Sequence, residues 1–505
     1  MNIDSIHPLT IILFLPVLGA ILIALFARQA RTVRLTAALF TFAAFALSLA
    51  LFVIFDRDGG LQFVEQAQWI KSIGAEYYIG VDGLSLPMVI LTTFLGFVAV
   101  FVSWKIDVRP REYFVWLLLL EAGIIGVFCS LDFLLFFLFW EVELIPMYML
   151  ITIWGGGRRQ YSATKFVIYT LFGSAFMLVG ILALYFSTPE SVNSANELVS
   201  HTFNMVTIAG NGADWLVPVI PLASMFFLIF IAFAIKLPVF PLHTWLPDAH
   251  TDAPTAVSVM LAGVLLKMGA YGMVRLVAGF GDGGIIPGVA EDYAGILATF
   301  AVISVLYGAA ATMRQTDLKR MIAYSSVSHM GFVLLGIFAL NQVSLTGATV
   351  QMFSHGLITA LLFAMVGLVY EKTHQRQIPL LGGLARQMPV ITVVFSIAGL
   401  AALGLPTTVG FIAEFTVFVG SFGSTAIAGA KIYVVLAVLG IVLGAGYILW
   451  MLERVFYREP KEQYNDVGDA DNMEKAYIFA FVAMIMLFGV YPRLLFDLVG
   501  PVFGA

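Results

Sequence analysis

The sequence contains very little charge. Only 11% of its 505 residues are Asp, Glu, Lys or Arg, whereas an ordinary soluble protein carries about 25%. Hydrophobic residues make up 61% of the chain, and the mean hydropathy is +0.97. This composition excludes an ordinary soluble protein and predicts a membrane protein. The apolar windows described below leave no room for a separate soluble domain.

Cysteine is nearly absent as well. Cys129 is the single cysteine, which excludes internal disulfides and leaves too few thiolates for an iron–sulfur cluster or a Cys-rich zinc site. We therefore expect no cofactor and no metal in this chain. The first residues, MNIDSIHP, lack the Lys or Arg that begins a cleaved signal peptide, so we expect the first apolar window to be a retained helix.

Apolar windows long enough to cross a bilayer, which takes about 20 residues, recur along the whole chain. We place fourteen of them, at 8–27, 34–55, 84–104, 113–130, 132–153, 166–186, 216–237, 254–279, 293–312, 320–340, 345–370, 387–424, 431–452 and 476–496. The window at 387–424 is interrupted by GLPTT, which predicts one crossing made of a broken helix. The expected fold is an all-α polytopic membrane protein.

The basic residues lie mostly in alternate loops. If the N-terminus lies outside the cytoplasm, alternate loops are cytoplasmic. These loops contain three Lys or Arg residues each at 28–34, 105–111, 158–165, 314–320 and 372–386, none at 238–253 and four at 454–475. These 19 compare with 4 in the remaining loops and at the C-terminus. Because cytoplasmic loops are enriched in Lys and Arg, this bias supports fourteen helices with both termini outside the cytoplasm.

Two proline-containing segments interrupt the apolar pattern, KLPVFPLHTWLP at 236–247 and GLPTTVGFIAEF at 404–415. Proline removes a backbone donor and clashes with the preceding turn, so both helices should break. We divide the single membrane domain into helices 1–3 (1–110), two five-helix units (111–280 and 290–456) and helix 14 (475–505). Each break then falls in the fourth helix of its unit, a pattern typical of transporters built from inverted repeats.

Several ionisable residues fall inside the apolar windows. They are Glu121, Glu141, Glu143, Lys236, Lys267, Arg275 and Glu414. Glu141 and Glu143 point about 200° apart on a regular helix, so they cannot share a face. Arg275 lies near a helix end, and we expect its guanidinium to extend to the membrane interface.

A charge in mid-membrane costs about 2.5–3.5 kcal/mol, so the charges of Glu141, Lys236, Lys267 and Glu414 require compensation. We expect Glu141 to pair with Lys236, with Glu143 as the alternative acid. Burial disfavours a charged lysine and a nearby carboxylate stabilises it, so moving the carboxylate would load or unload a proton. The alternative is that these ion pairs only hold the helices together.

Helices 10 and 11 carry the same polar pattern. It consists of Ser325, Ser328 and His329 on one helix and Gln351, Ser354 and His355 on the other. Spacings of three and four place each trio on one stripe. Because imidazole gains and loses protons near neutral pH, the two stripes indicate a hydrated seam with relay histidines. Hydrogen-bonded structural histidines are the alternative.

Other polar residues have simpler interpretations. The spacing of His243, Asp248, His250 and Asp252 matches no standard metal site and is more consistent with capping of adjacent helix ends. Asp132 borders a tight turn and is expected to begin a helix.

Five segments closely resemble the antiporter-like subunits of respiratory complex I. They read FWEVELIPMYMLI, AIKLPVFPLHTWLPDAHTDAPTAVSVMLAGVLLKMGAYG, DLKRMIAYSSVSHMGF, QMFSHG and FIAEF, and the resemblance extends over the entire chain. It implies a Glu141–Lys236 pair, a central lysine at 267, relay histidines at 329 and 355, and a proton-exchange glutamate at 414. Thr407 and Ala413 depart from the pattern, since glycine is common at both positions in the family.

The resemblance also implies a function and partners. The chain would be a proton-translocating membrane-arm subunit without a redox centre, driven by quinone reduction in other subunits. Glu414 separates it from the L and N types of the family, which usually carry lysine there. Its expected partners are these neighbouring L-type and N-type subunits and the lateral helix of the L type. A sodium–proton antiporter or membrane-bound hydrogenase subunit, or a non-pumping structural subunit, are the alternatives.

Overall fold

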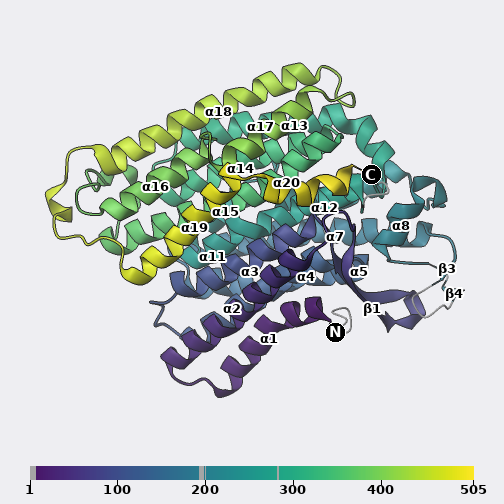
Figure 1. Cartoon of the computed structure of the whole chain (residues 1–505), viewed down its shortest axis with the longest axis horizontal. Helices are drawn as coiled ribbons and strands as arrows, with labels where there is room; N and C mark the ends of the chain where they lie inside the picture. Colours follow the sequence, from purple (N-terminus) through teal and green to yellow (C-terminus); the bar gives the residue numbers. More distant parts are fainter. Residues whose placement is uncertain (1–6, 193–197, 200, 281–283, 505) are drawn as a thin grey trace.

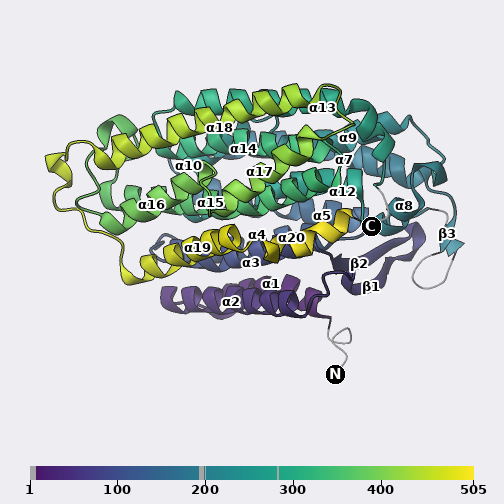
Figure 2. The same cartoon turned by 45° about the horizontal axis from the view of Figure 1, so that its top comes forward.

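The computed structural model describes residues 7–192, 198–199, 201–280 and 284–504. Its long helices run roughly parallel to one another, and the two chain ends lie at the same end of the bundle as the strands (Figure 1). We call this end the hairpin face. Helices α1 and α2 form an outer pair on one side, and α13 and α18 lie on the opposite side (Figure 2).

Within the described residues, twelve helical segments are long and apolar enough to cross a membrane. They are α1 (Pro8–Phe26), α2 (Ala30–Ile54), α3 (Ser85–Val102), α4 (Pro110–Cys129), α5 with α6 (Phe133–Trp154), α7 (Arg159–Ser187), α11 to α12 (Thr255–Ala278), α13 (Pro287–Met313), α14 (Leu318–Phe338), α15 (Gln342–Thr373), α18 with η6 (Ala430–Tyr457) and α19 (Asn472–Val490). These segments confirm the polytopic helical fold expected from the apolar windows.

The remaining two expected crossings are built from shorter helices. One consists of α9 (Leu222–Lys236), an irregular turn and α10 (Trp245–Asp252), and the other of α16 (Pro389–Ala402) and α17 (Val409–Phe422). Both interruptions therefore lie where the Leu-Pro segments predicted them. The inverted relation between the two five-helix units stays a prediction.

Burial differs strongly among the helices. The 18-residue apolar window within Thr255–Ala278 is entirely buried, and 94% of the corresponding windows of α14 and α15 is buried. In contrast, α1, α2, α18 and α19 bury less than half of theirs. The three buried segments form the axis of the bundle, so polar groups on them are shielded from lipid by the surrounding helices.

Two further helix irregularities were not expected. The helix containing Glu143 is interrupted at that residue, between α5 (Phe133–Val142) and α6 (Leu144–Trp154). A π-helical turn, η4 (Leu261–Leu265), separates α11 (Thr255–Met260) from α12 (Leu266–Ala278). Turns of this kind leave local carbonyls without their usual partners and occur frequently at functional sites.

The hairpin face carries strands that the helical prediction omitted. Strand β1 (Gln62–Ile70) pairs antiparallel with β2 (Ala75–Val81) through a short turn, η2 (Lys71–Ile73). The buried Glu65 carboxylate on β1 accepts the backbone N–H of Leu9 at 2.7 Å and of Thr10 at 3.2 Å. Because the first N–H groups of a helix have no partner within it, this carboxylate anchors the start of α1 to the hairpin.

Smaller elements complete the described chain. They are β3 (Ser191–Val192), β4 (Leu198–Val199), α8 (Met205–Asn211), η3 (Ala213–Trp215), η5 (Ile378–Leu380), η7 (Glu462–Tyr464), α20 (Arg493–Val499) and η8 (Gly500–Phe503). Asp132 is the N-cap of α5, as expected, and accepts the amides of Leu134 and Leu135. Burial raises the pKa of Asp132 to about 6, although these amides and that of Glu76 donate to its carboxyl group.

The second break contains a strained residue, one of the two departures from the family pattern. Thr407 has a φ of 81°, in the left-handed region where a β-branched side chain is unfavourable. Its carbonyl oxygen packs against α19, where a Cβ at Gly489 would lie 2.2 Å from it. Such backbone strain costs on the order of 1–3 kcal/mol and persists only where surrounding packing enforces it.

Substituting glycine at this position should stabilise the protein. We expect Thr407→Gly to raise the free energy of unfolding by about 1 kcal/mol, because glycine adopts positive φ without a steric penalty. Thermal unfolding of the purified chain in detergent measures the change. The neighbouring Thr408, with a φ of −103°, is the matched control. Thr408→Gly should destabilise by about 0.5–1 kcal/mol, and a destabilised Thr407→Gly would contradict the assignment of strain.

Candidate functional site

The buried lysine at the first break pairs with Glu143. The Lys236 Nζ contacts Glu143 Oε1, and both side chains are almost completely buried. The expected pairing of Lys236 with Glu141 is therefore wrong. Glu141 is only half-buried, and no hydrogen bond of its Oε1 is found within the described chain.

The helix is interrupted at Glu143, after α5 has ended at Val142, but the backbone of Glu143 stays in the right-handed helical region, with φ −69° and ψ −22°. The spacing of the two acids predicted that they face different directions, but not which of them faces Lys236. Gly123 of α4 leaves room for the turn, since a Cβ there would lie 3.3 Å from the Glu143 Cβ. Glu141 and Glu143 point in different directions, as their spacing predicted.

Aromatic rings surround the ammonium of Lys236. It lies 5.1 Å from the centroid of the Trp140 ring and 5.6 Å from that of Phe166. Cation–π contacts of this kind add stabilisation where water is excluded. Helix α12 approaches closely from the other side, because a Cβ at Gly269 would lie 3.1 Å from the Lys236 Cβ. The first lysine thus sits directly against the helix that carries the second.

Lys267 lies in the middle of the bundle, on the segment Thr255–Ala278. Its Nζ donates to the Ala262 carbonyl oxygen, which belongs to the π-helical turn η4, and contacts His355 Nδ1 at 2.8 Å. The irregular turn therefore supplies a carbonyl oxygen that partly replaces water around the ammonium. Lys267 forms no ion pair with a carboxylate of the described residues.

The two histidines and Glu414 continue from Lys267. The rings of His355 and His329 lie 5.7 Å apart between centroids, and His329 Nδ1 contacts Glu414 Oε1 at 3.0 Å. A cavity of about 10 Å³ lies among these residues, enough for about one water molecule. Lys267, His355, His329 and Glu414 thus form a row in which neighbouring polar groups are in contact or separated by one water-sized gap.

Local backbone features position Glu414. Gly404 has a φ of 71°, and a Cβ at this position would lie 3.1 Å from Glu414 Oε2, so a side chain there would press on the carboxylate. The Gln351 Nε2 donates to Glu414 Oε1 at 3.3 Å. The break before α17 therefore gives the carboxylate space, and α15 gives it a donor.

Two buried polar residues near this row were not singled out as candidates. Tyr447, on α18, is buried and interacts electrostatically with Glu414. His250, on α10, stacks on Phe363 with ring centroids 4.3 Å apart, and its ring nitrogens have no hydrogen-bond partner within the described chain. Tyr447 lies seventeen positions beyond the start of its helix, in an apolar sequence without any motif, and only the fold reveals its proximity.

Other expectations for single residues need correction. Arg275 does not extend to the membrane interface. Its side chain is 1% exposed and forms two hydrogen bonds with Asp82, at 2.7 and 2.8 Å. Asp248 pairs with Lys165 at 2.8 Å, and Asp252 accepts the Ser162 hydroxyl at 2.5 Å, so these acids join α10 to α7 rather than cap a helix.

Glu121 is buried but lies apart from the row. Its carboxyl group fills the space beside Gly96 of α3, where a Cβ would lie 2.3 Å from the Glu121 Cδ, and its Oε1 has no partner within the described residues. His243, Asp248, His250 and Asp252 do not come together as a metal site. Among the residues that the structure describes, no group of three or more His, Cys, Asp and Glu side chains has a metal-binding arrangement.

The arrangement is suited to proton transfer. An acid–lysine pair lies at one end, a lysine and two imidazoles lie in the middle, and a carboxylate lies at the other end, all inside a membrane-spanning bundle. Each group can bind and release a proton. No hydrogen bond within the described chain joins Lys236 to Lys267, so water or side-chain movement would have to complete the row there.

Comparisons with known proteins agree with this geometry. Residues 130–440 match the family described as NADH:quinone oxidoreductase/Mrp antiporter, transmembrane. The chain is 42% identical to NADH-quinone oxidoreductase subunit M of Rhodobacter capsulatus, over 98% of this chain and 95% of that protein. It is 43% identical to NAD(P)H-quinone oxidoreductase chain 4 1 of Synechococcus elongatus, over 96% of this chain and 89% of that protein.

A solved structure is also similar. A chain of respiratory complex I from Thermus thermophilus with bound NADH superposes with a TM-score of 0.84 and is 28% identical, with 98% of each chain covered.

The correction of the ion pair leads to a direct test. We expect Glu143→Gln to lower the free energy of unfolding by about 3–5 kcal/mol, because it leaves Lys236 buried without its counter-charge. Glu141→Gln, two positions away on a half-buried side chain, is the control and should change it by less than about 1 kcal/mol. The double variant Glu143→Gln/Lys236→Met should recover most of the loss. Thermal unfolding measures all three, and an equal loss in Glu141→Gln would refute the pairing.

Proposed function

Because this chain belongs to the NADH:quinone oxidoreductase/Mrp antiporter transmembrane family, we propose that it is a proton-translocating subunit in the membrane arm of a respiratory NADH:quinone oxidoreductase, of the subunit M or chain 4 type. The observation that carries the proposal is the row of contacts from Lys267 through His355 and His329 to Glu414, inside the most buried helices of the bundle.

Each residue of the row has a proposed role. Lys236 is the modulated lysine, Glu143 its partner, and Lys267 the central proton carrier. His355 and His329 relay the proton, and Glu414 exchanges it with the far side of the membrane. Glu141, which the family resemblance favours as the partner, lies two residues from Glu143 and is proposed to hold a proton next to the pair.

The pair at the first break gives the row a means of control. An ammonium in a low-dielectric interior is stabilised by a carboxylate in contact with it and loses this stabilisation when the carboxylate moves away. Both partners lie at helix interruptions, Glu143 between α5 and α6 and Lys236 at the end of α9. Interrupted helices can move at the break without disrupting long hydrogen-bonded segments. Opening of the Glu143–Lys236 pair would therefore change the charge next to α12 and alter the proton affinity of Lys267.

The driving energy would come from elsewhere in the complex. With a single, buried cysteine, this chain offers no cluster of thiolates for electron transfer. We propose that it binds neither NADH, flavin nor an iron–sulfur cluster, and that quinone reduction in other subunits drives the opening and closing of the ion pair. It is thus part of an enzyme without having a redox centre of its own.

Other subunits of the membrane arm are the proposed partners. Large apolar side chains remain exposed on α1, α2, α7 and α18, and a multi-pass subunit covers such faces with lipid or neighbouring helices. We propose that the neighbours are the L-type and N-type antiporter-like subunits. The lateral helix of the L-type subunit would lie along the surface of this chain. The proposed location is the bacterial inner membrane, with the hairpin face and both termini on the periplasmic side.

Loss of the central residues should uncouple pumping from electron transfer. We expect Lys267→Met and Glu414→Gln each to lower proton pumping by roughly tenfold or more, because proton transfer through a positioned group contributes about 10²–10⁴-fold. The assay compares proton uptake with NADH oxidation for the whole complex in liposomes. Lys431→Met, on the exposed face of α18, is the matched control and should pump normally. Full pumping in both central variants, with the complex assembled, would support a structural subunit instead.

The orientation can be tested by labelling. Ser72 is exposed on the hairpin face and Gln160 at the opposite end of the bundle, while the native Cys129 is buried. In intact spheroplasts, a membrane-impermeant maleimide should label Ser72→Cys and leave Gln160→Cys unlabelled until the membrane is opened. The reverse labelling pattern would place both termini in the cytoplasm.

A further inference from the structure

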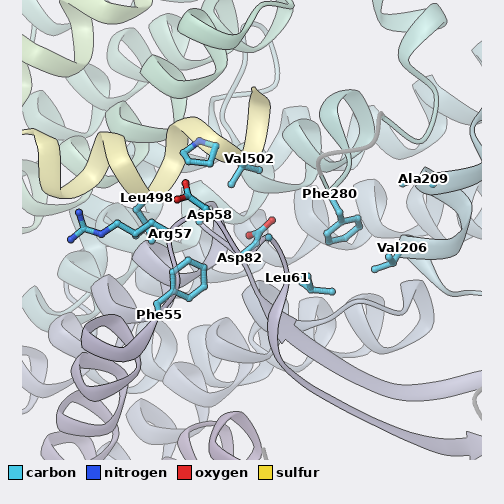
Figure 3. A pocket seen from close by; sticks show the side chains of 14 residues that line it. Phe55, Arg57, Asp58, Leu61, Asp82, Val206, Ala209, Phe280, Leu498 and Val502 are labelled. Atoms are coloured by element: carbon cyan, nitrogen blue, oxygen red, sulfur yellow. The ribbon is translucent and has the colours of Figure 1, made fainter. Parts of the chain in front are cut away.

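A cavity of about 330 Å³ opens at the hairpin face, and none of the residues from Lys267 to Glu414 in the row lines it. It is bordered by the end of α2, the start of the hairpin, α8 and the C-terminal segment, with Phe55, Arg57, Asp58, Phe280 and Leu498 among its lining residues. In Figure 3 the Asp82 carboxylate lies between Asp58 and Leu61 among the lining side chains, and Phe280 lies on its other side. A cavity of this size that opens to the surface and has charged side chains in its lining holds water.

The floor of the cavity is a closed ion pair. Asp82 Oδ1 accepts the backbone N–H groups of Leu84 and Ser85, which fixes the carboxylate at the start of α3. Two parallel hydrogen bonds of 2.7 and 2.8 Å join this carboxylate to Arg275, whose side chain is 1% exposed. Arg275 also donates to the Gly279 carbonyl oxygen at 2.9 Å. The guanidinium is therefore held in one position directly behind the cavity.

Arg275 lies on the same stripe of α12 as the central lysine. Lys267, Tyr271 and Arg275 are spaced four residues apart, so their side chains follow one face of the helix over about 12 Å. Tyr271 occupies the middle of the stripe, where its hydroxyl donates to the Phe128 carbonyl oxygen at 3.1 Å. The Arg275 guanidinium lies 4.9 Å from the Tyr271 ring centroid and 4.2 Å from that of Phe280. Along this face of α12, Arg275 therefore lies between the cavity and Lys267.

An arginine in this position cannot act as a proton carrier. Its guanidinium stays protonated in proteins, so it neither accepts a proton from the cavity nor delivers one to Lys267. It does repel a hydronium ion or a second positive charge, as fixed arginines do in water-conducting pores that exclude protons. An open path here would connect the central lysine to the hairpin side without passing His355, His329 and Glu414.

We propose that Arg275, held by Asp82, is an electrostatic barrier that prevents protons in the hairpin-face cavity from reaching Lys267. The inference rests on the proposed function, since a barrier matters only where Lys267 carries protons. Asp82 is a positioning residue that fixes the barrier in place. The positive charge of Arg275 performs the exclusion.

The magnitude follows from Coulomb repulsion. Two unit charges about 12 Å apart at an effective dielectric constant of about 20 would change an equilibrium by about tenfold. The opposite charge of Asp82 offsets part of this repulsion, so the barrier acts mainly on a proton that comes close to Arg275. A proton that passes Arg275 approaches much closer than this, so tenfold is the smallest effect expected.

The test measures passive proton flow, without NADH, through the assembled complex in liposomes under an imposed potassium diffusion potential. Arg275→Gln should raise the flow by about tenfold or more, because the barrier loses its charge. Arg275→Lys should leave it unchanged, because it keeps a positive charge on the floor of the cavity. Asp82→Asn should not raise it, because it removes only the negative charge of the pair. Arg57→Gln, on the rim of the same cavity, is the matched control and should also leave it unchanged.

Two further variants separate the barrier from a packing defect. Asp82→Asn/Arg275→Gln has no unpaired buried charge, should assemble even if Arg275→Gln does not, and should leak as Arg275→Gln does. Adding Lys267→Met to Arg275→Gln should remove the extra flow, since the leak runs through the central lysine.

Three results would overturn the proposal: no more proton flow in Asp82→Asn/Arg275→Gln than in the wild-type complex, as much flow in Asp82→Asn as in Arg275→Gln, or no suppression of the extra flow of Arg275→Gln by Lys267→Met. Electron transfer is absent from this assay, so it does not test proton pumping. If the Arg275→Gln complex does not leak, the barrier proposal fails, and the proposed function is still tested separately by pumping in Lys267→Met and Glu414→Gln.

Discussion

The need to pair buried charges inside an apolar helical bundle is the constraint on which the rest of the structure depends. An ion in this interior requires a partner, and the fold supplies a different one at each point: a carboxylate for Lys236, a carbonyl oxygen and an imidazole for Lys267, and a histidine and an amide for Glu414. Of these two lysines, Lys236 has an ion pair with a carboxylate of the described chain and Lys267 has none. Opening or closing that ion pair would therefore change the proton affinities of the other groups in the row.

Helix irregularities place these partners. Three of the buried charges lie at or directly beside an interruption: Glu143 between α5 and α6, Lys236 at the end of α9, and Lys267 two residues after a π-helical turn. A regular helix satisfies its own backbone and leaves no carbonyl for a side chain, whereas an interrupted one offers carbonyl oxygens and space. Glycines complete the arrangement, since Gly269 lets α9 approach α12 and Gly404 leaves room for Glu414. The irregularities that weaken the helices are thus what makes charge tolerable inside them.

Much of this could be predicted from the sequence, and the failures have specific physical causes. The spans, the two proline breaks and the row from Lys267 to Glu414 follow from hydropathy, proline chemistry and matched polar stripes. The choice of Glu141 over Glu143 failed because the spacing of the two acids shows only that they face different directions, and the fold decides which of them faces Lys236. The hairpin was missed because a hydropathy window does not detect short strands. Arg275 was misplaced because its partner, Asp82, is 193 residues away, and no local pattern reveals that contact.

The most direct test of the central claim is a map of the assembled complex at a resolution that reveals water. The account predicts ordered water between Lys236 and Lys267, where side chains alone do not connect, and a water in the cavity among His329, His355 and Glu414. Dry, close-packed side chains between the two lysines in every state of the complex would contradict it, because no proton could then pass from the ion pair to the rest of the row.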